Sequence, residues 1–147
     1  MSAAVDPVES PCVCATLRMA TRAVARIYDQ ALEPFGLRTT QYSILARLEV
    51  EGSAPLGHLA ARLAIDRTTL AREVEPLVRV GLVAEARGED RRRRVLSLTP
   101  DGLSRLESAQ PAWRAAQRSV KEQLGRERTD GLLEELRALL GAVRGAS

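Results

Sequence analysis

The sequence predicts a mainly helical α+β fold, in which one β-hairpin interrupts a series of amphipathic helices. Two observations carry this prediction. Apolar residues recur at helical spacing over most of the 147 residues. By contrast, residues 87–94 hold five arginines and lead directly into the run Val95–Leu98, which is typical of a strand. With 45% hydrophobic residues, a chain of this length can bury a substantial core.

The chain begins with small, polar and acidic residues, and we expect residues 1–10 to form a flexible arm. Ser10 then suits the N-cap of a helix, and Pro11 suits its first residue. The following apolar residues alternate steps of four and three and are Val13, Leu17, Ala20, Val24, Ile27 and Ala31. This stripe predicts a helix with a seam for another helix, which Pro34 and Gly36 end.

Three shorter helices are predicted next. The first covers about residues 39–50 and the second covers residues 55–63, each with one apolar face. After a turn at Ala64-Ile65, Asp66 suits the N-cap of a third helix over residues 67–80. The last two helices, joined by a tight turn, predict a helix-turn-helix.

The outward face of the helix at 67–80 is polar in its first turns. Hydroxyl and guanidinium groups at this end of a helix could contact base edges and phosphates in a DNA major groove. The predicted DNA-binding residues of this helix are Arg67, Thr68, Thr69 and Arg72.

A β-hairpin is predicted after the helix-turn-helix, with strands at Leu82–Ala86 and Val95–Leu98. An isolated arginine run is usually a solvated surface. Because this run directly follows a helix-turn-helix, the hairpin is predicted to be a DNA-binding wing. The predicted DNA-binding residues of the wing are Asp90, Arg91, Arg92 and Arg94.

Two long helices complete the predicted fold. Thr99 and Pro100 suit the start of the first, which reaches about Leu124. Beyond Gly125, leucines recur along a last helix as far as Val143, and their apolar face exceeds what a small domain can cover.

These helices predict a homodimer. The expected division of the chain is a winged helix-turn-helix at 37–102, with dimerisation helices at 11–36 and 103–147. The alternative is that the terminal helices pack within one chain.

Charge and composition narrow the functional classes. The formal net charge is +3, so nucleic-acid binding must depend on where the arginines lie rather than on total charge. No apolar run approaches the roughly 20 residues of a membrane span, and the first residues resemble no signal peptide, so we expect no membrane partner and a cytoplasmic protein. His58 is the only histidine and lacks metal-ligand partners at recognisable spacing, which predicts no metal site and no cofactor.

Cys12 and Cys14 lie at the start of the first predicted helix. A helix N-terminus favours a thiolate, and two thiols this close permit oxidation chemistry, whereas Glu9 opposes thiolate formation. Redox sensing and inert thiols are both open interpretations. A cysteine-dependent enzyme is a further alternative, but the sequence holds no recognisable catalytic triad or phosphate loop, so we predict no enzyme activity.

In the predicted wing, Asp90-Arg91-Arg92 is followed by Leu98–Gly102 (LTPDG). This pattern resembles the wing signature, Asp-x-Arg followed by Leu-Thr-x-x-Gly, of the multiple antibiotic resistance regulator (MarR) family of winged-helix repressors. Leu37–Leu48 resembles the family's second helix and Leu59–Leu82 its helix-turn-helix, and the resemblance extends over nearly the whole chain from Cys12.

The resemblance implies specific roles. Arg92 enters the minor groove, Asp90 helps to hold it, and the helix after Asp66 reads the major groove, while the first and last helices of two protomers intertwine. In the family's organic hydroperoxide regulators a reactive cysteine begins the first helix, and Cys14 is at the equivalent position. Tyr28 falls where that subgroup has a tyrosine near the thiol, although Arg18 replaces another tyrosine expected there.

The sequence therefore predicts a homodimeric DNA-binding transcription regulator and repressor, whose partner is double-stranded DNA with a pseudo-palindromic operator. Release is expected through oxidation of Cys12 and Cys14 or through a small-molecule effector. The alternatives are a regulator with inert cysteines that responds only to a small ligand, and an adaptor that keeps the fold without binding DNA.

Overall fold

The computed structural model describes residues 12–90 and 92–144. The predicted flexible arm at 1–10, the predicted cap Ser10, Pro11 and the wing residue Arg91 lie outside the described residues. The elements are α1 (Val13–Leu32), the 3₁₀ helix η1 (Glu33–Phe35), α2 (Thr39–Glu51), β1 (Ser53–Pro55), α3 (Leu56–Leu63), α4 (Arg67–Arg79), β2 (Val83–Arg87), β3 (Arg94–Leu98), α5 (Pro100–Leu124) and α6 (Arg126–Arg144). This order confirms the predicted mainly helical winged helix-turn-helix.

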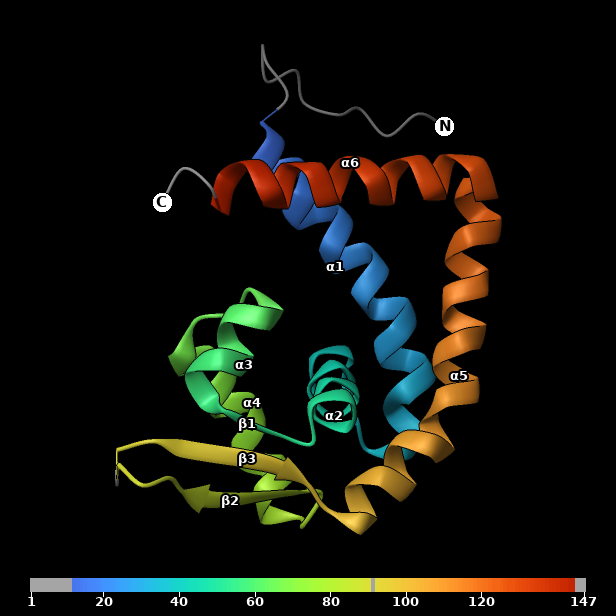
Figure 1. The fold of residues 1–147 in the computed structure, drawn as a ribbon. Coiled ribbons are helices and arrows are strands. Elements are labelled where there is room, and N and C mark those ends of the chain that lie inside the picture. The colour runs from blue at the N-terminus through green and yellow to red at the C-terminus, as the bar shows by residue number, and fades with distance from the viewer. Residues whose placement is uncertain (1–11, 91, 145–147) are drawn as a thin grey trace.

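Two regions are visible in Figure 1. A compact lobe combines α2, α3 and α4 with the small sheet, and the β2–β3 hairpin extends from it as the wing. From the lobe, α5 runs along α1, and α6 then turns back across α1 at the far end. The wing and α6 therefore lie at opposite ends of the molecule.

The sheet contains a strand that sequence analysis missed. The strand order is β1-β3-β2, with every pair antiparallel. The sequence predicts no strand between the helices at 39–50 and 55–63, yet Ala54 pairs with Leu96 of β3. Pro55 has an extended backbone and precedes α3, so the predicted helix start at Pro55 was wrong by one residue. Three residues are too few for the alternation that identifies a strand.

The start of α1 also differs from the prediction. Cys12, not Ser10, is the N-cap, with an extended backbone, and its Sγ accepts the N–H of Ala15 at 3.5 Å. The prediction that Pro11 begins the helix was therefore wrong, because Cys12 already lies outside the helical conformation. Only Cys14 of the two cysteines is helical.

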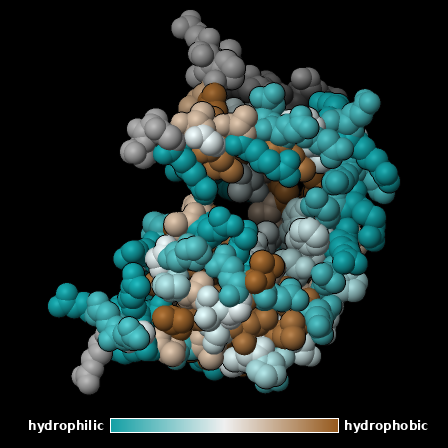
Figure 2. All heavy atoms as spheres, viewed as in Figure 1, coloured by the Kyte–Doolittle hydropathy of each residue, from teal (hydrophilic) through white to brown (hydrophobic). Residues whose placement is uncertain are grey.

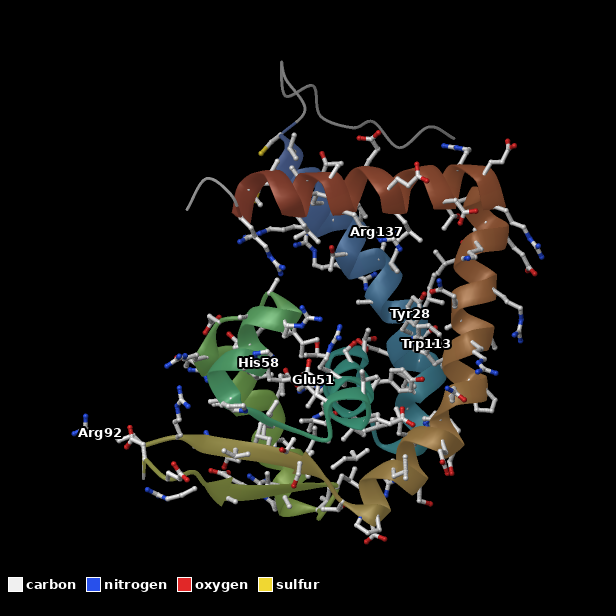
Figure 3. All side chains as sticks on the ribbon, viewed as in Figure 1. Tyr28, Glu51, His58, Arg92, Trp113 and Arg137 are labelled. Atoms are coloured by element: carbon white, nitrogen blue, oxygen red, sulfur yellow. The ribbon has the colours of Figure 1, made fainter. Side chains whose placement is uncertain are left out.

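The core of the lobe joins α2, α3, α4 and β3. Its fully buried side chains include Ile44, Leu45, Leu48, Leu59, Leu70, Val74 and Leu96. An aromatic cluster continues this core toward the terminal helices: Trp113 of α5 stacks on Tyr42 of α2 with ring centroids 5.6 Å apart. Tyr28 of α1 lies beside Trp113 (Figure 3) and donates a hydrogen bond to Gln117 Oε1. Burial raises the pKa of Tyr28, so its hydroxyl remains a donor over the ordinary pH range.

The joint between the sheet and α5 depends on a glycine. Thr99 caps α5, since its Oγ1 accepts the N–H of Gly102 at 3.0 Å while donating to the carbonyl of Gly81 at 2.6 Å. Gly102 is buried against the chain just before β2, and a Cβ on it would overlap the carbonyl oxygen of Leu82. Only glycine fits this contact without moving backbone.

We expect Gly102→Ala to lower the free energy of unfolding by about 1–3 kcal/mol, because α5 must move away from Leu82. The matched control is Gly131→Ala in α6, where a Cβ meets no atom within 4 Å of the described structure. That change should raise the free energy of unfolding by about 0.5–1 kcal/mol through helix propensity. Urea denaturation at equal protomer concentration measures both, and equal stability of the two variants would contradict the close contact at Gly102.

Candidate nucleic-acid interface

The turn between α3 and α4 fixes the start of the second helix. Ala64 has a left-handed backbone with φ of 53°, and the N–H of Ile65 donates to the carbonyl of Ala60 at 3.0 Å. Asp66 then caps α4: Oδ1 accepts the N–H of Thr69 at 2.9 Å, and Oδ2 accepts its hydroxyl at 2.6 Å. These hydrogen bonds from Thr69 lower the pKa of Asp66, so the cap is ionised at neutral pH.

The four residues predicted on α4 do not have equal freedom. Thr68 and Arg72 are exposed, whereas the hydroxyl proton of Thr69 is already donated to Asp66. The guanidinium of Arg67 lies over α3, because a Cβ added to Gly57 would be 2.5 Å from Arg67 Nη2. Arg67 is thus directed toward the start of α3, and Thr68 and Arg72 remain on the open face.

The wing is a hairpin closed by backbone contacts. Arg87 pairs with Arg94 at the end of the ladder, and the N–H of Gly88 donates to the carbonyl of Arg93 at 2.8 Å. Asp90 Oδ1 accepts the N–H of Arg92 at 3.2 Å. In Figure 3 the side chain of Arg92 projects from the tip of the wing, away from the lobe.

Arg94 is held by an ion pair across the wing. Its Nε and Nη2 donate to the two carboxylate oxygens of Glu85 at 2.6 and 2.9 Å, across β2 and β3. The bond from Arg94 holds the pKa of Glu85 below its usual range. Sequence analysis missed Glu85, since the pairing depends on the strand register and has no signal in local spacing.

The start of α4 and the wing share one groove of about 490 Å³. It is lined by Pro55, Leu56, Gly57, His58, Arg67, Arg92, Arg93 and Arg94. The fold therefore brings Arg67 together with three wing arginines that follow it by 25 or more positions. A concave surface with this concentration of guanidinium groups attracts phosphate.

An acidic side chain behind the groove holds its histidine. His58 Nε2 lies 3.0 Å from Glu51 Oε2, and Arg62 Nε lies 3.7 Å from Glu51 Oε1 (Figure 3). Glu51 was not predicted as a site residue, because its place at the end of α2 gave no sign of its neighbours. Among the residues that the structure describes, the ion pairs join one arginine of the groove, Arg94, to a carboxylate, that of Glu85.

The cysteines lie far from this groove. Cys12 and Cys14 are free and exposed on α1, and Cys14 lines an apolar groove between α1 and α6. Figure 2 shows hydrophilic side chains over the wing and a hollow between the lobe and the terminal helices.

Across the described residues, no three His, Cys, Asp or Glu side chains gather as metal ligands. Within the same ranges, no helix has the length and apolarity needed to span a membrane.

The sequence matches no protein-family model, but it is similar to known transcriptional regulators. It is 38% identical to the transcriptional regulator MosR of M. tuberculosis, whose crystal structure in complex with DNA matches with a TM-score of 0.76, covering 91% of this chain and 99% of that one. E. coli MarR complexed with operator DNA matches at 19% identity with a TM-score of 0.80, over 94% of this chain and 99% of that one, which shows the fold alone.

A curated relative is also recognised by sequence. An uncharacterized HTH-type transcriptional regulator of Bacillus subtilis, YwoH, is 29% identical over 91 residues, or 62% of this chain. The matched stretch spans 66% of the length of that protein.

The Glu85–Arg94 pair makes a pH-dependent contribution to stability. Because the folded-state pKa of Glu85 is lowered, the contribution is present above the usual glutamate pKa of about 4.3 and is lost as pH falls through the lowered value. We expect Glu85→Gln to lower the free energy of unfolding near pH 7 by less than about 1 kcal/mol, since the pair is partly exposed.

Urea denaturation across this pH range measures the difference between wild type and variant, which should narrow below pH 4.3. The control is Glu89→Gln, which removes a neighbouring wing carboxylate outside the pair and should leave stability nearly unchanged at both ends of the range. A Glu85→Gln difference that persisted at strongly acidic pH would contradict the assigned ion pair.

Proposed function

The chain belongs to the MarR family of winged helix-turn-helix transcriptional regulators, and we propose that it acts as a homodimeric repressor that binds double-stranded operator DNA. The observation that carries this proposal is the groove in which Arg67 of α4 meets Arg92, Arg93 and Arg94 of the wing. Its relative MosR, 38% identical, is crystallised in complex with DNA.

The proposed DNA contacts divide between α4 and the wing. The first turns of α4 enter a major groove, where Thr68 and Arg72 reach base edges and phosphates. Thr69 supports this end mainly through the Asp66 cap, although one face of its side chain is exposed. The groove beside Arg67 receives a backbone phosphate.

At the wing, Arg92 enters the adjacent minor groove, and the Asp90 contact to its backbone orients it. Arg94 lines the groove while Glu85 holds two of its nitrogens, so it contributes positive charge and a rigid hairpin together. Arg91 is proposed as a DNA contact only because it belongs to the arginine run of the wing.

The proposed dimer is supported by apolar side chains that a single chain leaves open. Val13 is 63% exposed and Leu140 47%, and both residues line a groove of about 740 Å³ between α1 and α6. Monomeric proteins rarely leave contiguous large apolar patches in water. Within its own chain α1 contacts α5, and its buried residues, Tyr28 and Leu32, lie in its last turns. The exposed N-terminal half of α1 and the C-terminal half of α6 are therefore proposed to contact the partner.

A symmetric dimer would place two α4 helices on one face of the duplex. The proposed operator is pseudo-palindromic, with half-sites about one helical turn, roughly 34–36 Å, apart.

The proposed release uses the two thiols. One thiolate attacks the peroxide oxygen and becomes a sulfenic acid as water or an alcohol leaves; the second thiol displaces water from it and forms a disulfide. Joining Cys12 to Cys14 would remove the Sγ cap from Ala15 and unwind the first turn of α1, which borders the proposed dimer groove. A disulfide between protomers and a small-molecule effector are the competing routes.

Arg92→Ala should weaken binding to operator duplex because a minor-groove cation is lost. The slope of log affinity against log salt concentration should become shallower by the amount expected for about one phosphate contact. Gel shifts over a series of salt concentrations measure both quantities. The control is Arg128→Ala, which removes an exposed arginine of α6, the helix at the end of the molecule away from the wing. Unchanged affinity and salt dependence in Arg92→Ala would contradict the proposed wing contact.

Leu140→Glu should shift the dimer to monomer, because a carboxylate would be buried without a partner in an apolar interface at a cost of several kcal/mol. Light scattering gives the mass. The matched control is Val50→Glu, which places the same charge on a 77% exposed valine of α2 and should leave the mass unchanged. A monomeric wild type, or a Leu140→Glu variant that remained dimeric, would contradict the proposed interface.

Peroxide should release DNA from the wild type but not from Cys14→Ser, with Cys14 as the first oxidised thiol and Cys12 as the resolving thiol. Mass spectrometry of the treated protein identifies the bridge, and gel shifts give the affinity. If both Cys12→Ser and Cys14→Ser lost DNA as the wild type does, the cysteines would not be the sensor, and a small-molecule effector would become the better account.

A further inference from the structure

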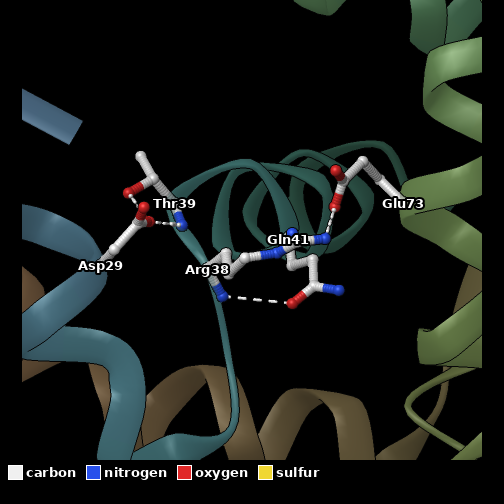
Figure 4. Close-up of polar contacts among 5 residues, drawn as sticks. All are labelled: Asp29, Arg38, Thr39, Gln41 and Glu73. Carbon is white, nitrogen blue, oxygen red and sulfur yellow. Dashed lines mark hydrogen bonds and ion pairs between the residues drawn. The ribbon is translucent and has the colours of Figure 1, made fainter. Parts of the chain in front are cut away.

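Two polar contacts connect α1, α2 and α4 in series (Figure 4). Asp29, in the last turns of α1, accepts from Thr39 twice through Oδ1, from its N–H at 2.8 Å and from its hydroxyl at 2.7 Å. One residue earlier, Arg38 Nη2 lies 2.7 Å from Glu73 Oε2 on α4. The chain of contacts therefore runs from a terminal helix, through the start of α2, to the helix proposed to read DNA.

The first of these contacts anchors the start of α2. Arg38 is its N-cap but supplies no side-chain cap, so the free N–H groups of the first turn need other acceptors. Asp29 provides one from a different helix, and a carboxylate is favoured at the positive end of the helix dipole. Gln41 Oε1 adds a bond from the N–H of Arg38 at 3.1 Å. Gln41 and Asp29 thus hold the backbone N–H groups of Arg38 and Thr39 at the start of α2.

The second contact acts on α4 itself. Glu73 follows Thr69 by four residues, so the two lie on the same face of α4. The side chain of Glu73 is only 20% exposed, whereas that of Arg38 is 61% exposed. An unpaired carboxylate here would repel a DNA phosphate, and Arg38 compensates it. An ion pair this exposed contributes little to stability, which favours a role in orienting α4.

We propose that Arg38 and Glu73 are positioning residues for DNA recognition, and that Asp29 ties this pair to α1, so that the position of α1 sets the orientation of α4. The inference rests on the proposed DNA-binding function and adds to it a route by which a change in the dimer helices reaches the recognition helix. None of the three residues needs to contact DNA for this role.

The test is a double-mutant cycle of Arg38→Gln, Glu73→Gln and the combined variant, with the affinity for operator and for an unrelated duplex measured in each. Removing Arg38 takes away a positive charge and removing Glu73 a negative one, so the two changes shift binding to the unrelated duplex in opposite directions. A positioning role instead lowers the ratio of operator affinity to unrelated affinity in both.

We expect each single variant to lower this ratio threefold to tenfold, and the combined variant to be no lower than the worse single variant. The reversed pair, Arg38→Glu with Glu73→Arg, should recover the ratio to within about twofold, while melting temperatures stay close to that of the wild type. Asp29→Ala should lower the ratio similarly, and Asp29→Asn, which keeps an acceptor for Thr39, should retain most of it.

The matched control is the pair Glu75 and Arg79, which lie 3.2 Å apart and both belong to α4. Glu75→Gln and Arg79→Gln should leave the ratio unchanged. An unchanged ratio in Arg38→Gln and Glu73→Gln, or losses that add in the combined variant, would overturn the inference while wild-type binding preserved the proposed function. A wild type that bound no duplex would overturn both.

Discussion

The apolar packing of α4 against α2, α3 and β2 is the interaction on which the rest of the structure depends. Leu70, Val74 and Leu77 are buried on one side of α4, and Val83 is buried on β2. Burial of each such side chain contributes about 1.5–3 kcal/mol, more than any exposed ion pair of the lobe. This packing orients the opposite side of α4 and the wing together, so residues separated in the sequence share one groove.

Placing several arginines in one groove carries an electrostatic cost, because like charges at short range repel. The structure reduces this cost selectively. Glu85 pairs with Arg94 and Glu51 pairs with His58, each behind or beside the groove. Arg92 and Arg93 have no comparable carboxylate partner among the ion pairs of the described residues. A phosphate backbone would supply the missing negative charge, and this is why we propose DNA binding as the function of the groove.

The sequence predicted what local spacing determines. The cap at Asp66, the end of α1 near Pro34 and the buried side of α4 all follow from residues within one or two turns of each other. Contacts between distant residues were not predictable in the same way. β1 was missed because its three residues acquire strand geometry only from β3. The Glu85–Arg94 pair depends on strand register, and the Arg38–Glu73 pair joins residues 35 positions apart. The start of α1 was misplaced because Ser10 and Pro11 are typical of a helix beginning, whereas cysteine is not a preferred N-cap residue.

The central claim is that two copies of the chain hold one duplex through paired α4 helices and outward wings. A hydroxyl-radical footprint on the DNA that flanks the gene of this protein tests it most directly. The account predicts two protected blocks related by a two-fold axis and centred about one helical turn apart, each flanked by minor-groove protection from a wing. A single protected block, or protection without two-fold symmetry, would contradict it.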